Sequence, residues 1–185
     1  MVLQLLRHQF TVKQFHQMAE SGILLENERI ELIRGEIIDM SPIGRRHASC
    51  VNILVNLLIQ LLGKRIILAP QNPVVLDETS EPQPDIALLK PRPDFYRNSH
   101  PQPEDIFLLI EVADTTVKYD REVKIPLYGE ANIPEVWLVD VNQEIIEVYR
   151  NPLQGVYQDV QKLVKSQRLS ILAFPDVSIN VGEIF

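Results

Sequence analysis

Two acidic residues, Asp85 and Glu111, lie in stretches that otherwise resemble buried β-strands. Asp85 opens the apolar run DIALL, and Glu111 lies in the middle of LLIEVAD. An ionised carboxylate in an apolar setting is costly unless a partner compensates its charge. If the two strands are neighbours in one sheet, the carboxylates meet across the ladder at roughly 5 Å between Cβ atoms. Because two such carboxylates repel each other, we expect Mg²⁺, which prefers oxygen ligands, between them.

Each of the two residues also has a simpler explanation when it is taken alone. Asp85 can merely end the loop that follows Pro84, and Glu111 can be satisfied by a nearby arginine. Their occurrence together, ahead of a helix that carries further charges, favours the metal-binding interpretation.

The helix expected from about Val117 to Ala131 offers a cation for this pair. Residues i and i+2 of a strand share a face, and the residue two positions after Glu111 is Ala113, where an E-x-K nuclease strand carries its lysine. There the ammonium lies near the scissile phosphate and the attacking water. Lys124 on the following helix has a side chain long enough to extend back over the sheet edge, and it can supply the missing charge.

Asp120, Lys124 and Tyr128 are spaced by four and form one stripe on this helix. The alternative is that Asp120 and Lys124 form a solvated ion pair worth only about 0.3–0.5 kcal/mol. Pro126 is expected to kink the helix because it cannot donate a hydrogen bond to the carbonyl of Glu122. Tyr128 is interpreted as a packing or hydrogen-bonding residue, not as a catalyst.

At this point the sequence resembles the bacterial Uma-two family, which belongs to the PD-(D/E)xK nuclease superfamily. The resemblance covers nearly the whole chain, including FTVKQFHQMAE, ERIELIRGEIIDMSP and RRHASCVNILVNLL. The site series consists of Pro84-Asp85, Glu111-Val112, Asp120, Lys124 and Tyr128, leading into GEANIPEVWLVD. PD and E-x-K alone occur by chance, whereas the ordered series from Glu31 to Asp140 is much more specific.

The resemblance implies a restriction-endonuclease-like fold, a dependence on Mg²⁺ or Mn²⁺, and DNA as the substrate. Asp85 and Glu111 would be metal ligands, with the backbone carbonyl of Val112 as a third. Lys124 would hold the attacking water or stabilise the charge that develops on the phosphate.

Two further catalytic candidates, Glu31 and His47, match family positions. By the resemblance, Glu31 would bind the metal through water or support a second metal ion. Alternation in RIELIRGEI leaves open a solvent-facing Glu31 instead. Helical spacing places His47 on the inward face of its helix, where a phosphate contact, a proton carrier and a hydrogen-bonded core histidine all remain open.

Composition and punctuation predict one α/β (α+β) domain over residues 1–185, in which helices flank a mixed β-sheet core with added β-hairpins. Expected helices follow Thr11 and span 47–62 and 117–131, and a hairpin turns at Arg34-Gly35. Strands are expected in RIILA, PVVL, QPDIALL, LLIEVAD, PEVWLVD, EIIEVYR and the tail. The irregular KPRPDFYRNSHPQPE is expected beside a functional cleft.

The net charge of -7 argues against a broad basic surface that holds nucleic acid through phosphates alone, although short basic groups allow a locally positive cleft. The apolar window CVNILVNLLIQLL is expected to fall short of a membrane span. The start of the chain lacks the pattern of a signal peptide, and the single Cys50 cannot form an internal disulfide, so we expect a cytoplasmic protein without a membrane partner.

The sequence gives little support for a zinc site or a reactive cysteine. The four histidines, His8, His16, His47 and His100, show no paired zinc-ligand spacing, and Cys50 inside an apolar helix is expected to be inert. The main alternative to a DNA endonuclease is a catalytically inactive module of the same fold that binds nucleic acid or a protein partner. Hydrolysis of RNA is a third hypothesis. A homodimer is plausible, because cutting two strands needs two sites.

Overall fold

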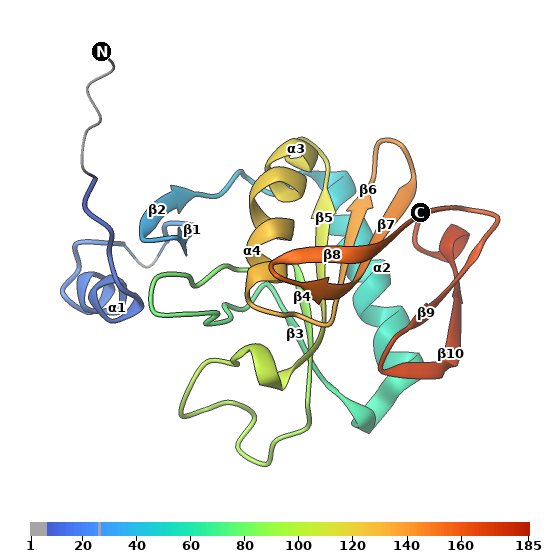
Figure 1. Ribbon diagram of the computed structural model, residues 1–185, viewed down its shortest axis with the longest axis horizontal. Coiled ribbons are helices and arrows are strands. Elements are labelled where there is room, and N and C mark those ends of the chain that lie inside the picture. The colour runs from blue at the N-terminus through green and yellow to red at the C-terminus, as the bar shows by residue number, and fades with distance from the viewer. Residues whose placement is uncertain (1–6, 26) are drawn as a thin grey trace.

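The computed structural model describes residues 7–25 and 27–185, and its centre is a six-stranded mixed sheet in the order β3-β4-β5-β6-β7-β8 (Figure 1). The strands are β3 (Ile67–Pro70), β4 (Ile86–Leu89), β5 (Ile106–Ala113), β6 (Glu135–Asp140), β7 (Ile145–Leu153) and β8 (Val156–Val164). Neighbouring strands are antiparallel except β5 and β6, which are parallel. A parallel pair requires a crossover connection, and the helical segment between these two strands provides it.

The crossover contains three consecutive helical pieces. They are α3 (Val117–Tyr119), the π-helical turn η3 (Asp120–Lys124) and α4 (Ile125–Glu130). The sequence predicts one kinked helix here, and the structure adds that the irregularity is a π-turn immediately before Pro126. Because proline has no amide hydrogen to donate to the carbonyl four residues back, the regular α-helical ladder cannot continue through this point.

The two faces of the central sheet pack against different elements. Helix α2 (Arg45–Leu62) and the hairpin of β9 (Arg168–Ile171) and β10 (Phe174–Asn180) share a core with Leu108 and Ile110 of β5. On the opposite face α4 packs with Leu109 and Ala113. Both faces of β5 are therefore buried, as its near-continuous apolar sequence predicts.

A smaller unit at the other end of the molecule contains α1 (Val12–Glu20) and the hairpin of β1 (Ile30–Ile33) and β2 (Glu36–Asp39) (Figure 1). Thr11 caps α1 through a reciprocal pair of hydrogen bonds with Gln14. Arg34 and Gly35 both have positive φ, 48° and 77°, as the tightest hairpin turns require. The predicted helix start and the predicted hairpin are both confirmed.

One prediction about the chain between β3 and β5 is wrong, and a second stays a prediction. PVVL forms no strand; Val74 and Leu76 are buried in an extended segment whose amides donate to the carbonyls of Pro82 and Ser80. The irregular segment 90–104 does not line the main cavity described below, although part of it borders a second, smaller hollow. Although PVVL has the composition of a β-strand, its backbone amides are hydrogen-bonded to loop carbonyls and not to a neighbouring strand.

Helix α2 is longer and more apolar than the sequence window suggested. Counted over Arg45–Arg65 it is long and apolar enough to cross a membrane, so the expectation that it falls short was wrong by that measure. The core helices of soluble proteins pass the same test, and in this structure Leu54 and Leu58 are fully buried against the sheet. Asn52, Asn56 and Gln60, which are spaced by four along the same helix, are exposed.

Candidate active site

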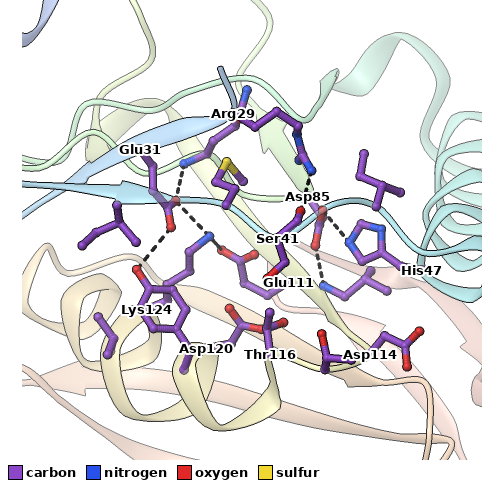
Figure 2. Close-up of a pocket in the computed structure, with 18 of the residues that line it drawn as sticks. Arg29, Glu31, Ser41, His47, Asp85, Glu111, Asp114, Thr116, Asp120 and Lys124 are labelled. Atoms are coloured by element: carbon purple, nitrogen blue, oxygen red, sulfur yellow. Dashed lines mark hydrogen bonds and ion pairs between the residues drawn. The ribbon is translucent and has the colours of Figure 1, made fainter. Parts of the chain in front are cut away.

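A cavity of about 610 Å³ opens where the start of α2 meets β1, the beginning of β4, the end of β5 and the crossover helices (Figure 2). Its charged side chains include five that the fold buries almost completely. They are Glu31, Asp85, Glu111, Asp120 and Lys124. Buried charges are rare unless they are paired or functional, which makes this cavity the candidate site.

The pairing of β4 with β5 brings Asp85 beside Glu111. Ile86 of β4 lies opposite Ile110 of β5 in an antiparallel register. Asp85, which precedes Ile86, therefore lies opposite Glu111, which follows Ile110. Asp85 Oδ2 accepts a hydrogen bond of 2.8 Å from the amide of Val112. The predicted role of Val112 used its carbonyl oxygen, whereas the contact in the structure is made by its N–H group.

Lys124 lies between two carboxylates. Its Nζ atom is 3.1 Å from Oε2 of Glu31 and 3.2 Å from Oε1 of Glu111 (Figure 2). Ala113, at the usual lysine position, is fully buried in the core that α4 shares with the sheet. The ammonium that contacts Glu111 therefore comes from Lys124 of the crossover helices and not from strand β5 itself.

The π-turn η3 presents both of its terminal charged residues to the cavity. Asp120 and Lys124 are 5% and 3% exposed, so they do not form the solvated ion pair that the sequence left open. Asp120 Oδ2 accepts a 2.7 Å hydrogen bond from the hydroxyl of Thr116. The sequence placed Asp120 on the stripe of Lys124 and among the family motifs but assigned it no catalytic or metal-binding role; its four-residue spacing from the lysine was the available signal. Single π-turns inside helices frequently occur at functional sites.

Two tyrosines hold the carboxylates that flank Lys124. Tyr119 donates to Oε1 of Glu31 at 3.3 Å, and Tyr128 donates a short hydrogen bond to Oε1 of Glu111. Oε2 of Glu31 also accepts from the amide of Gln83 at 3.1 Å. Glu31 is therefore a buried, fully engaged residue of the cavity, and the solvent-facing alternative is wrong.

The electrostatics of the cavity are dominated by burial. Burial raises the pKa of Glu111 well above its usual value, although the Lys124 ammonium opposes this shift. Burial similarly raises the pKa of Asp120 to about 6, again opposed by Lys124. For Lys124 burial alone would lower the pKa, but the charges of Glu111, Glu31 and Asp120 outweigh it and raise the pKa, so the lysine stays protonated.

His47 joins the site from the first turn of α2. Its Nε2 lies 2.9 Å from Oδ1 of Asp85. Its Nδ1 is buried and, within the part of the chain that the structure describes, has no hydrogen-bond partner. His47 thus fixes Asp85 from the side opposite Val112 and carries a nitrogen that remains free to bond. Cys50 on the same helix is buried, and burial raises the pKa of its thiol to about 12, as expected for an inert residue.

The donor set suits a divalent cation. Seven carboxylate residues line the cavity against the cations Arg29, Lys118 and Lys124, so this cavity is not the locally positive cleft that the short basic groups allowed. Four of these carboxylates are buried, and such an excess is stabilised by a hard cation, which prefers oxygen ligands. Within residues 7–25 and 27–185, no three of the cavity's carboxylate or imidazole groups bring their ligand atoms within 4.8 Å of one another.

Arg121, one residue beyond Asp120, anchors the π-turn to the sheet. Its guanidinium donates two hydrogen bonds of 3.0 Å to Glu147 on β7. Lys162 and Tyr149 also contact this buried carboxylate. Burial opposes ionisation, but these hydrogen bonds lower the pKa of Glu147 to about 2.

We expect Glu147→Gln to lower the free energy of unfolding at neutral pH by about 1.5–3 kcal/mol, the usual range for hydrogen bonds to a charged group. A carboxylate whose pKa is lowered by folding stabilises the protein above its unfolded pKa, and that contribution is lost as the pH falls towards about 2. The difference between variant and wild type should therefore shrink below about pH 5 in urea unfolding. Glu144→Gln, which removes an exposed ion pair with Lys165, is the control and should cost less than about 1 kcal/mol. Equal losses for the two variants would contradict this.

The sheet, the helical crossover and the buried acidic cavity define a restriction-endonuclease-like fold of the nuclease class. Residues 12–182 match the model of the family Uma2, described as "Putative restriction endonuclease". The chain belongs to this family, as its motifs suggested. A solved structure titled as a "putative nuclease belonging to DUF820" from Anabaena variabilis is similar, with a TM-score of 0.72 and 16% identity over 95% of this chain and 97% of that one. At that identity the likeness concerns the fold alone. No curated protein gave a significant match.

Proposed function

We propose that this protein is a metal-dependent endonuclease that hydrolyses phosphodiester bonds in DNA. The observation that carries the proposal is the contact of Lys124 with Glu111 beside Asp85, in a buried cavity of a chain from a nuclease family. These are the residue types that a PD-(D/E)xK site requires, with the lysine supplied by the next helix.

Asp85 and Glu111 would hold Mg²⁺ or Mn²⁺, and the carbonyl of Val112 is proposed as a third ligand. When bound, the ion supplies Lewis acidity towards the phosphate and lowers the pKa of a coordinated water. His47 and the Val112 amide keep Asp85 oriented into the cavity. An oriented carboxylate loses less side-chain entropy on binding than a free one.

Lys124 is proposed to donate a hydrogen bond to the attacking water or to a phosphate oxygen as negative charge develops there. Its raised pKa keeps it a cation at neutral pH. Glu31 positions the ammonium from the other side, at 3.1 Å. Glu31 is therefore proposed as a positioning residue, with a water-mediated metal contact as its further role.

The direct test is cleavage of supercoiled plasmid and of duplex oligonucleotides with Mg²⁺ or Mn²⁺. We expect nicked or linear DNA that depends on the metal and disappears with a chelator. Asp85→Ala, Glu111→Ala and Lys124→Ala should remove the activity, whereas Lys165→Met, a surface substitution in the Glu144 ion pair, should not. Metal-dependent cleavage that survives the first three substitutions would overturn these roles.

The alternative is an inactive nuclease-fold module that binds nucleic acid or a protein partner. It is motivated by Ala113 at the usual lysine position and by the acidic lining of the cavity. Absence of divalent-metal binding in calorimetry, together with absent or salt-insensitive DNA association, would favour it. Parallel assays on RNA distinguish the third hypothesis.

A homodimer is proposed as the form that cuts both strands, because two active sites related by a two-fold axis match the symmetry of a duplex. Light scattering on the purified protein with and without duplex DNA measures the assembly. A monomer that nicks only one strand would argue against it.

A further inference from the structure

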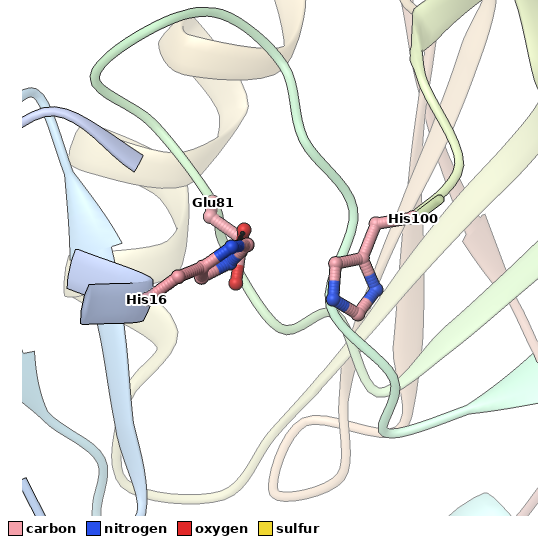
Figure 3. Close-up of side chains that lie close together, drawn as sticks. All are labelled: His16, Glu81 and His100. Carbon is pink, nitrogen blue, oxygen red and sulfur yellow. Dashed lines mark hydrogen bonds and ion pairs between the residues drawn. The ribbon is translucent and has the colours of Figure 1, made fainter. Parts of the chain in front are cut away.

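Two histidines and a glutamate from three distant parts of the chain converge outside the candidate active site (Figure 3). His16 lies on α1, Glu81 in the segment that precedes β4, and His100 in the irregular segment before β5. One possible ligand atom from each lies within 4.8 Å of the others. His16 Nε2 and Glu81 Oε2 are 2.7 Å apart. None of the three lines the main cavity.

Glu81 is the rigid member of this cluster. It is 5% exposed, and its main chain pairs with Leu32 of β1 through hydrogen bonds of 2.7 and 3.2 Å in both directions. Its side chain is therefore fixed in position and directed at His16. A carboxylate buried to this degree requires a compensating partner, and the partner that the structure provides is the imidazole of His16.

His16 and His100 face each other at the edge of a hollow of about 400 Å³ that they both line. Their ring centroids are 5.7 Å apart at an interplanar angle of 63°. The hollow leaves space for a water molecule beside the two histidines. Three protein ligands and an open position make up a common coordination set for zinc.

We propose that His16, Glu81 and His100 bind a Zn²⁺ ion, with water as the fourth ligand. Two imidazole nitrogens and one carboxylate oxygen suit zinc better than Mg²⁺ or Ca²⁺, which prefer sets made of oxygen. Ligand atoms around a tetrahedral zinc lie roughly 3.3 Å apart. His100 is exposed in an irregular segment and approaches the other two by the small remaining distance.

The bound ion would join α1, the segment of Glu81 and the segment of His100 into one rigid unit. Because Glu81 pairs with Leu32, this unit adjoins Glu31 of the candidate active site. Zinc would therefore stabilise the edge of the structure that carries Glu31. The proposal does not depend on nuclease activity, because binding and stability alone test it.

The test uses the full chain freed of metal with a chelator and then titrated with Zn²⁺ by calorimetry, or with Co²⁺ by visible absorption. We expect one site in the wild-type protein with the intense absorption of four-coordinate Co²⁺, and a rise in melting temperature on addition of Zn²⁺. His16→Gln and His100→Gln should each weaken Zn²⁺ binding at least about tenfold, the lower limit seen even for outer-sphere partners, and should abolish the thermal shift.

Two further variants make the result decisive. His8→Gln, which alters a histidine packed edge-to-face against Phe10 outside the cluster, should bind Zn²⁺ like the wild type. Asp85→Asn, which alters the main cavity, should keep this zinc site as well. Circular dichroism verifies that each variant is folded. Zn²⁺ binding that persists in both His16→Gln and His100→Gln, or that is lost in Asp85→Asn alone, would overturn the proposal, as would a wild-type protein that binds no Zn²⁺.

Discussion

Replacing Lys124 with methionine is expected to lower the free energy of unfolding by about 3–5 kcal/mol, the usual cost of removing one partner from a buried charge cluster. The reason is that Glu31 and Glu111, both almost fully buried, would lose the ammonium that lies within 3.2 Å of each. Because methionine keeps much of the packing volume of lysine, the loss of stability measures mainly the effect of removing the positive charge. Urea unfolding monitored by circular dichroism measures it.

The charge argument also predicts how the loss depends on pH and on a second substitution. Burial raises the pKa of Glu111 above its unfolded value, and without Lys124 only the hydrogen bond from Tyr128 opposes that rise. Ionised Glu111 then destabilises the fold, so the deficit should shrink as the pH falls and the carboxyl becomes protonated. The double variant Lys124→Met/Glu111→Gln should recover part of the stability at neutral pH.

Lys118→Met is the matched control, because Lys118 is an exposed lysine of α3, one turn and a half before Lys124. Its effect on stability should stay within about 0.5 kcal/mol, as for most surface substitutions. A Lys124→Met protein as stable as the Lys118→Met protein would show that the buried ion cluster does not hold the crossover helix in place.

The second large effect is expected on catalysis. Asp85→Asn should lower the rate of metal-dependent plasmid cleavage by at least about 10²–10³-fold, the size of loss typical when one electrostatic element of an active site is removed. Asparagine is nearly isosteric and its side-chain oxygen can still accept from the Val112 amide. The variant should therefore stay folded while losing the charge that metal binding requires.

Single-turnover cleavage rates and Mn²⁺ calorimetry on the same samples distinguish a loss of metal binding from a loss of catalysis with the metal still bound. We expect Mn²⁺ affinity and cleavage to fall together in Asp85→Asn. Asp159→Asn on the distant strand β8 is the control and should retain both. Cleavage by Asp85→Asn at the wild-type rate would remove Asp85 from the mechanism, and unchanged Mn²⁺ binding would assign the metal to other carboxylates.

The sequence determined the features that depend on neighbours along the chain. A near-continuous apolar run marks β5, with Glu111 as its single acidic interruption, and Arg34-Gly35 marks the hairpin turn. Capping marks the start of α1. The four-residue spacing of Asp120 and Lys124 indicated a shared face. Each of these signals comes from steric and hydrogen-bonding rules that act within a few residues.

Only the tertiary structure decided which distant groups meet. The burial of Glu31 depends on contacts with Gln83, Tyr119 and Lys124, which no local pattern encodes. PVVL has strand-like composition but found no ladder partner. The histidines show no zinc-ligand spacing along the sequence. Folding nevertheless brings His16 and His100 close to Glu81, which lies far from both in the sequence. Steric and hydrogen-bonding rules between neighbouring residues determine the local conformation. Contacts between distant residues depend on how the whole core packs. The candidate site of this protein is made of such long-range contacts.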